Sequence, residues 1–214
     1  NTNQHLKGKV IKDMLHPILL GLMSFARKYI NKQKLEIIND RREKKKHSSR
    51  KKEKPVIYAI THVGMYDVQV VSEAIRDHQY TFMGDPETMY RTGDGFIMAL
   101  NGVVYCDNDD KGRDTVTAKN TSIDALNKGI NMMIYPEGVW NLSPNLLVLP
   151  LFNGVIDIAL ETDCEIIPVA IEQYDNEFIV NIGKNMNINP EKKTFSTNDE
   201  RKKYINEQKE ILRD

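Results

Sequence analysis

The chain has 214 residues, enough for one domain with a buried core. Hydrophobic residues make up 40% and charged residues 28%, which excludes a disordered chain and a protein that crosses a membrane many times. The formal net charge is zero, yet residues 41–54 hold nine Lys and Arg against two Glu, so the rest of the chain is net acidic. This asymmetry indicates an electrostatic contact made by one segment.

The two cysteines, Cys106 and Cys164, lie in dissimilar contexts without a Cys-x-x-Cys spacing. This pattern excludes a disulfide framework, argues against a zinc knuckle, and favours a reducing compartment. The first residues lack the charged start, apolar run and small-residue cleavage site of a signal peptide. No weight is given to missing terminal motifs, because the chain opens without Met and closes inside a helical pattern.

The first predicted element is a helix over residues 10–30. Its central apolar run, 17–26, is shorter than the roughly 20 residues that a membrane-spanning helix needs. Two interpretations stay open: the helix packs on the domain's own core, or it is an amphipathic helix that lies in a membrane interface, where basic flanks favour anionic lipid. The apolar residues recur at spacings of three and four: Ile11, Met14, Leu15, Ile18, Leu19, Leu22, Met23, Phe25, Ala26 and Ile30.

The basic run at 41–54 contains no apolar residue and is predicted to be solvated. It is either a surface linker or a contact with an anionic membrane face, which is worth roughly 1 kcal/mol per basic residue near the surface. Nucleic acid is not an expected partner, because no aromatic residues are interleaved and no known RNA- or DNA-binding module is present. Residues 1–54 are therefore predicted to be an amphipathic helical arm and basic linker, and residues 55–214 a separate domain.

From Pro55 onward, apolar strand-like runs alternate with helical patterns. This alternation predicts an α/β domain with a largely parallel, mixed sheet flanked by helices, preceded by the helical N-terminal arm. In such sheets, functional groups gather just past the carboxyl ends of the strands. The expected strands are 56–60, 80–83, 103–106, 130–135, 165–171 and 178–182, and the expected helices are 68–76, 86–100, 115–127, 155–160 and 199–212.

A histidine and an aspartate follow the first of these strands. His62 lies in a turn with Gly64, and Asp67 begins the next helix. Five residues rotate by about 140° on a straight helix, so the two side chains meet only if His62 stays in the turn. The carboxylate would then hold one imidazole nitrogen and leave the other free as a base. With five His and sixteen Asp in the chain, about 0.4 such pairs arise by chance, so the pair alone favours a helix cap beside a packed His.

Two further segments also carry functional candidates at strand ends. In Tyr135-Pro136-Glu137-Gly138 a buried strand is followed by a carboxylate beside a glycine, and a glycine lets a ligand approach the backbone closely. An ordinary turn with an exposed Glu is the alternative. Pro168 interrupts the strand at 165–171, and because proline cannot donate to a sheet ladder, it predicts a sheet edge or a strand start.

Four segments in order resemble the sequence blocks of the glycerolipid acyltransferases, the family of 1-acylglycerol-3-phosphate acyltransferases. His62 to Asp67 resembles the His-x4-Asp block, and Gly102 to Asp107 resembles a second block that ends in Asp. Tyr135 to Gly138 resembles the third block, commonly Phe-Pro-Glu-Gly, and Ile167 to Val169 resembles the fourth. The blocks span about residues 56–172 at family-like separations, so the chain is identified as a member of this family.

The resemblance implies transfer of a fatty acyl group from acyl-CoA or acyl carrier protein to a hydroxyl of a lysoglycerolipid such as 1-acylglycerol-3-phosphate. It implies that His62 is the general base, that Asp67 orients it, and that Glu137 and Gly138 serve acceptor binding or the shape of the site. It also implies direct attack, with no metal, cofactor or acyl-enzyme. The expected location is the cytoplasmic face of a membrane, as a peripheral or monotopic protein, with acyl carrier protein as a candidate partner.

Two residues depart from the family pattern. The family commonly has Arg where this chain has Asn108 and Trp140, and those arginines are associated with the acceptor's phosphate. Either Lys111 or Arg113 compensates, or the acceptor lacks a phosphate, such as a glycan or glycolipid whose sugar stacks on Trp140. Two other hypotheses are a non-catalytic lipid-binding protein of the same fold and a thioesterase that transfers acyl groups to water.

Overall fold

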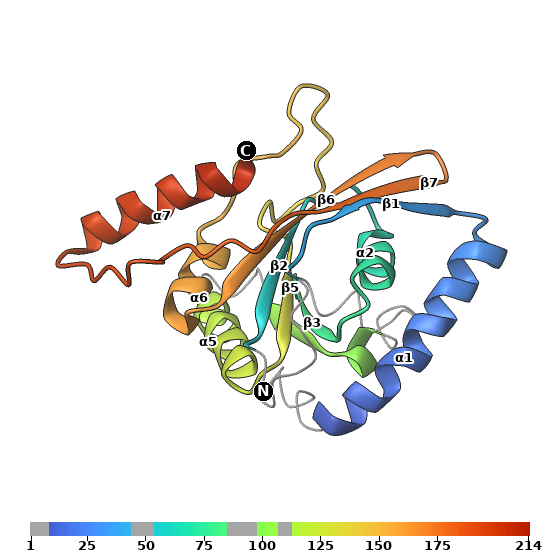
Figure 1. Ribbon diagram of the computed structural model, residues 1–214, viewed down its shortest axis with the longest axis horizontal. Coiled ribbons are helices and arrows are strands. Elements are labelled where there is room, and N and C mark those ends of the chain that lie inside the picture. Colours follow the sequence, from blue (N-terminus) through green and yellow to red (C-terminus); the bar gives the residue numbers. More distant parts are fainter. Residues whose placement is uncertain (1–8, 44–53, 85–97, 107–112) are drawn as a thin grey trace.

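The computed structural model describes residues 9–43, 54–84, 98–106 and 113–214, and within them the chain forms one seven-stranded sheet flanked by helices (Figure 1). The strands lie in the order β1-β7-β6-β2-β5-β3-β4. Their bounds are β1 Lys34–Asp40, β2 Val56–Ile60, β3 Gln79–Gly84, β4 Val103–Cys106, β5 Asn131–Ile134, β6 Glu165–Tyr174 and β7 Glu177–Ile182. The helices are α1 Lys9–Phe25, continued by the π-helical η2 Ala26–Ile30, α2 Asp67–Ile75, α5 Arg113–Asn127, α6 Gly154–Thr162 and α7 Asn198–Arg213.

The sheet is largely parallel. Strand β2 pairs in parallel with β5 and β6, and β3 pairs in parallel with β5 and β4. Only the β6–β7 hairpin is antiparallel among the described strand pairs, and β1 adds to β7 in parallel. The α/β fold with a largely parallel, mixed sheet and a helical N-terminal arm is therefore confirmed.

Strand β2 is the central support of the domain, because both of its faces are covered. All five of its residues are buried. Ile57 and Ala59 belong to the core packed beneath α5 and α6, whereas Val56, Tyr58 and Ile60 belong to the core beneath α2. A strand buried on both faces reads as a continuous apolar run and is held rigidly. The backbone that leads from β2 to His62 is therefore held in a fixed position.

Strand β1 was not expected, because residues 1–54 were assigned to a helical arm and a linker. The structure places Lys34–Asp40 at one edge of the sheet, with Lys34 opposite Glu177 and a register shift between Ile37 and Asn39. Most side chains of this strand are exposed, so its sequence lacks the alternation of a half-buried strand. Of the helix expected at 86–100, residues 98–100 are helical and residues 85–97 lie outside the described residues.

Helix α1 packs on the domain through polar side chains and one leucine. Lys12, His16 and Leu19 are buried, as is Arg27 of η2, whereas Met14 and Ile18 are 71% and 61% exposed. The interpretation that this helix packs on the domain itself is therefore confirmed, although most of its large apolar residues face outward. Within the described residues, no helix is long and apolar enough to cross a membrane. The exposed apolar residues are Val10, Ile11, Met14, Ile18, Leu22, Phe25, Tyr29 and Ile30.

Named contacts explain this orientation of α1. The Lys12 ammonium donates to the Ala99 carbonyl at 2.6 Å, and burial lowers the pKa of Lys12. The His16 ring lies 2.7 Å from Oδ1 of Asn101 and 3.2 Å from the Arg76 carbonyl. Buried polar groups must find partners, so these contacts fix the polar side inward and leave the apolar side in solvent.

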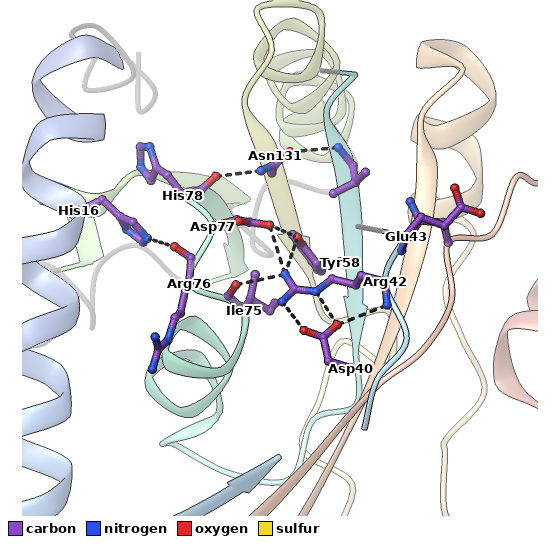
Figure 2. A network of polar contacts seen from close by, with 12 residues as sticks. His16, Asp40, Arg42, Glu43, Tyr58, Ile75, Arg76, Asp77, His78 and Asn131 are labelled. Carbon is purple, nitrogen blue, oxygen red and sulfur yellow. Dashed lines mark hydrogen bonds and ion pairs between the residues drawn. The ribbon is translucent and has the colours of Figure 1, made fainter. Parts of the chain in front are cut away.

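The two described flanks of the basic run lie at the amino-terminal edge of the parallel strands. Arg42 donates to Asp40, to the Ile75 carbonyl and to Asp77 (Figure 2). On the other flank, Lys54 pairs with Asp163, two residues before β6. Residues 44–53 lie outside the described residues, so the expected contact of this run with a membrane stays a prediction.

Candidate active site

The His62 and Asp67 side chains are in contact at the turn that connects β2 to α2. Nδ1 of His62 lies 2.8 Å from Oδ2 of Asp67. The same oxygen accepts hydrogen bonds from the backbone N–H groups of Val63, at 2.7 Å, and Gly64, at 3.0 Å. The Asp67 residue is 1% exposed and is the first residue of α2, where the helix dipole favours a negative charge. The turn therefore fixes the carboxylate, and the carboxylate fixes the imidazole.

This contact determines which imidazole nitrogen is available. A carboxylate only accepts hydrogen bonds, so Nδ1 of His62 carries the proton and donates a hydrogen bond to Asp67. The lone pair then lies on Nε2, the nitrogen that can take a proton from a substrate. The His62 side chain is 21% exposed, so the ring is partly open to a ligand. The buried charge of Asp67 would stabilise the imidazolium once it forms.

Two aromatic rings hold the His62 imidazole from its sides. The Tyr135 ring lies 4.5 Å away between centroids, and the Trp140 ring lies 6.2 Å away, nearly perpendicular to the imidazole. Burial, with a smaller contribution from the Asp67 charge, raises the pKa of Tyr135 well above its ordinary value. This phenol therefore stays neutral, and its hydroxyl lies 3.5 Å from the Met133 sulfur. Tyr135 positions the imidazole without exchanging protons.

Glu137 is buried behind the site. It is 2% exposed, and its two carboxylate oxygens each accept a backbone hydrogen bond. Oε1 accepts from the His62 N–H at 2.9 Å, and Oε2 accepts from the Leu149 N–H at 2.7 Å. One carboxylate thus ties the end of β2 to the segment that follows β5. The family resemblance implies either acceptor binding or a role in the shape of the site for Glu137, and these contacts favour the second.

Gly138 occupies a position that only glycine fills without strain. Its φ of +71° is in the left-handed region, and an added Cβ would lie 2.6 Å from the Phe152 ring. The Phe152 N–H also donates to the Pro136 carbonyl at 2.8 Å. The close approach expected at this glycine is therefore made by the protein's own Phe152, which folds residues 139–152 back onto the strand end.

Within the described residues, no three side chains of His, Cys, Asp or Glu come close enough together to hold a metal ion. At the His62 site the imidazole contacts one carboxylate, that of Asp67, while the Glu137 carboxylate bonds to backbone N–H groups. Such an arrangement suits the binding and transfer of a proton.

Comparison with known proteins decides the family. The family model described as Acyltransferase matches residues 37–172, about two thirds of the chain, and this span includes His62, Asp67 and Glu137. The chain belongs to the acyltransferase family. Its fold is similar to that in the crystal structure of the 1-acyl-sn-glycerophosphate (LPA) acyltransferase PlsC from Thermotoga maritima. That similarity has a TM-score of 0.60 and 17% identity, and covers 94% of this chain and 80% of PlsC. No curated protein sequence matches the chain.

The remaining predicted residues of this acyltransferase have three outcomes. Trp140 lies beside the imidazole and is 50% exposed. Asn108 and Lys111 lie outside the described residues, as does the side chain of Arg113. Pro168 was expected at a sheet edge or a strand start, and both are wrong, because it lies inside β6 between β2 and β7.

The sheet accommodates Pro168 because the β6–β7 ladder ends beside it. That ladder begins at Val169, and the Pro168 carbonyl accepts from the Gly183 N–H at 2.8 Å. The missing N–H of proline therefore removes only one bond at the end of the ladder. A strand interior is compatible with proline at such a rung, which the sequence pattern does not reveal.

Apart from Trp140, the segment that follows Gly138 was not expected to be part of this acyltransferase site. The Asn141 N–H donates to the His62 carbonyl at 2.6 Å, so this segment is bonded directly to the histidine. A signal was present, because residues 138–156 contain no charged residue. A long uncharged stretch beside a candidate catalytic turn is unusual in a chain that is 28% charged.

Proposed function

We propose that this acyltransferase moves a fatty acyl group from a thioester, acyl-CoA or acyl carrier protein, to a hydroxyl of a lysoglycerolipid such as 1-acylglycerol-3-phosphate. The observation that carries the proposal is the imidazole of His62, held by a buried carboxylate through Nδ1. Within the described residues, Nε2 has no protein partner, so it is available to a substrate. The structurally similar PlsC is a 1-acyl-sn-glycerophosphate acyltransferase, and its acceptor belongs to the same class.

The mechanism follows from the position of the free lone pair. Nε2 of His62 takes the proton of the acceptor hydroxyl as its oxygen attacks the thioester carbonyl carbon. The tetrahedral intermediate then collapses, the C–S bond breaks, and the thiolate takes the proton back from Nε2. The products are an ester and a free thiol. A positioned general base contributes typically 10²- to 10⁴-fold, and Asp67 stabilises the imidazolium that exists between the two transfers.

Membrane association is the second part of the proposal. The arm docks by its polar side, so the apolar side of α1 and η2 faces outward. An interfacial helix has this arrangement, with its apolar residues directed into the lipid. The proposed location is the cytoplasmic face of a membrane, as a peripheral or monotopic protein. Two free, buried cysteines suit a reducing compartment.

One observation favours a second acceptor class. Trp140 stands at a position where the family commonly has Arg, half-exposed and 6.2 Å from the His62 ring. An indole offers a flat stacking face and one donor but no charge for a phosphate. The alternative acceptor is therefore a glycan or glycolipid hydroxyl, with a sugar stacked beside the base.

A direct assay separates these possibilities. The purified chain is given acyl-CoA or acylated carrier protein with lysophosphatidic acid, with candidate glycans and glycolipids, and with no acceptor, while thiol release and products are measured. Saturable acylation of lysophosphatidic acid supports the phosphate acceptor and overturns the glycan hypothesis. Thiol release without an acceptor identifies a thioesterase. No thiol release from any donor identifies a non-catalytic lipid-binding protein.

A further inference from the structure

The loop formed by residues 139–152 projects from the domain next to His62. Figure 1 shows it as the yellow loop between β5 and α6 that rises above the sheet. Leu142 and Leu147 at its tip are 81% and 97% exposed. The loop carries no charged residue. Its other exposed apolar residues are Val139, Trp140, Leu146 and Phe152.

The tip of this loop pairs several of its backbone polar groups with its own side chains. The Asn141 amide donates to the Leu146 and Leu147 carbonyls, both at 3.1 Å, and its oxygen accepts from the Ser143 N–H at 3.0 Å. The Ser143 hydroxyl accepts from the Asn145 and Leu146 N–H groups. An unpaired backbone group is costly in an apolar phase. A loop bonded in this way carries these groups into lipid already paired, which lowers the cost of insertion.

The base of the loop is fixed to the catalytic strand ends. The Asn141 N–H donates to the His62 carbonyl, and the Leu149 N–H donates to the buried Glu137 carboxylate. Phe152 packs against Gly138 and closes the loop. Because the base of the loop is fixed, the leucines of the tip stay away from the core and remain exposed.

We propose that loop 139–152 dips into the lipid surface beside His62, as a second bilayer contact separate from α1. The inference rests on the proposed acyl transfer, which needs an insoluble acyl chain at this histidine. A bilayer fits the loop better than a second copy of the chain, because the exposed tip offers apolar side chains and no charged group that could pair with another copy. Trp140, at the base, has the place that indole rings take at a membrane–water interface. The acyl substrate would then reach the His62 imidazole without leaving the lipid.

The chain carries its own probe, because Trp140 is its only tryptophan. The full chain is mixed with vesicles of phosphatidylcholine and phosphatidylglycerol, with and without bromine on the acyl chains. Binding is measured by sedimentation, and insertion by the fluorescence of Trp140. We expect a shift to shorter wavelength on binding and strong quenching by the brominated lipid.

A pair of matched variants assigns the effect to the tip. The double variant Leu142→Asn/Leu147→Asn should lose most of the quenching yet still sediment with vesicles through α1. The control is Val116→Asn/Ile211→Asn, which changes two residues of similar chemistry, 59% and 57% exposed on α5 and α7, and should leave quenching unchanged. Circular dichroism melts verify that both variants are folded.

Three results would overturn the proposal. In the first, the chain sediments with vesicles while Trp140 is neither shifted nor quenched. In the second, it does not bind vesicles. In the third, the shift appears without lipid and grows with protein concentration, which would identify a second copy as the occupant. His62→Ala separates this inference from the proposed function, because that variant should lose acyl transfer and keep the quenching.

Discussion

The two ends of α2 carry opposite chemistry. At its first residue, the buried carboxylate of Asp67 accepts from the N–H groups of a turn and from His62. At its last turn, the Ile75 and Arg76 carbonyls face Arg42 and the buried ring of His16 (Figure 2). The acid lies at the positive end of the helix dipole, and basic side chains lie at the negative end.

The polar contacts at the two ends of α2 therefore have different roles. The amino-terminal end fixes one imidazole in one tautomer, so its polar contacts serve chemistry. The carboxyl-terminal end holds α1 and the segment after β1, so its polar contacts serve docking and leave the apolar side of α1 exposed. If this division is correct, changes at the first end should affect turnover, and changes along α1 should affect stability and membrane binding.

The largest expected effect is that of Asp67→Asn. The change keeps the shape of the side chain but presents an amide that favours the wrong imidazole tautomer, which costs about 10⁴-fold in a triad of similar logic. We expect kcat/KM for acyl transfer to fall by about 10³- to 10⁴-fold. Asp124→Asn, on the surface helix α5, is the control and should retain full activity. Wild-type turnover in Asp67→Asn would break the assignment of chemistry to this end of α2.

Arg27→Met should act on stability instead. Arg27 donates two hydrogen bonds to Glu73 at 2.9 and 3.0 Å, and the two side chains are 11% and 8% exposed. Removing one partner of such a buried pair leaves an uncompensated charge and costs about 3 kcal/mol. Urea unfolding measures this loss, and the double variant Arg27→Met/Glu73→Met should recover part of it. An unchanged unfolding midpoint in the single variant would contradict the view that polar contacts dock the arm.

Glu137→Gln should change both turnover and stability, because this buried carboxylate bonds to the catalytic turn and to the segment that follows β5. Gln has one acceptor oxygen where Glu offers two, so the N–H of either His62 or Leu149 loses its partner. We expect a loss of about 1–3 kcal/mol in the free energy of unfolding and a lower kcat with little change in KM. The opposite result, normal stability with a raised KM for the acceptor, would make Glu137 a contact of the acceptor.

The smallest expected effect is that of Tyr135→Phe. Because burial keeps the pKa of Tyr135 well above its ordinary value, the phenol is neutral across any working pH and takes no part in proton transfer. The ring that packs on His62 is retained. We expect activity within about twofold of wild type, a change of under about 0.5 kcal/mol, and an unchanged pH profile. A missing ionisation in the profile of the variant would give Tyr135 a chemical role.

Apolar patterns in the sequence predicted the fully buried strands closely. The bounds of β2 and β4 agree with those expected, because fully buried strands appear as continuous apolar runs. The meeting of His62 and Asp67 across a turn was also foreseen, since a strand end and a helix start leave few other arrangements. The edge strand β1 was missed, because its exposed side chains leave no alternation to detect.

Other features depend on the folded environment and could not be predicted from the sequence. Periodicity shows that α1 has two unlike sides but not which side faces the domain, and that is decided by partners such as Asn101 and Arg76, distant in the chain. The burial of Glu137 depends on Leu149, which returns to it twelve residues later. A short motif shows the residue types at a site, whereas the partners of each atom come from tertiary structure.

The central claim is that His62 is the base, and one measurement tests it most directly. Thiol release from acyl-CoA in the presence of a hydroxyl acceptor is followed for wild type and His62→Ala, with a thermal melt of each. We expect a fall in rate of about 10²- to 10⁴-fold, with Tm changed by less than about 4 °C, because Asp67 keeps its hydrogen bonds from the Val63 and Gly64 N–H groups when the imidazole is removed. Turnover retained in a folded His62→Ala variant would contradict the account.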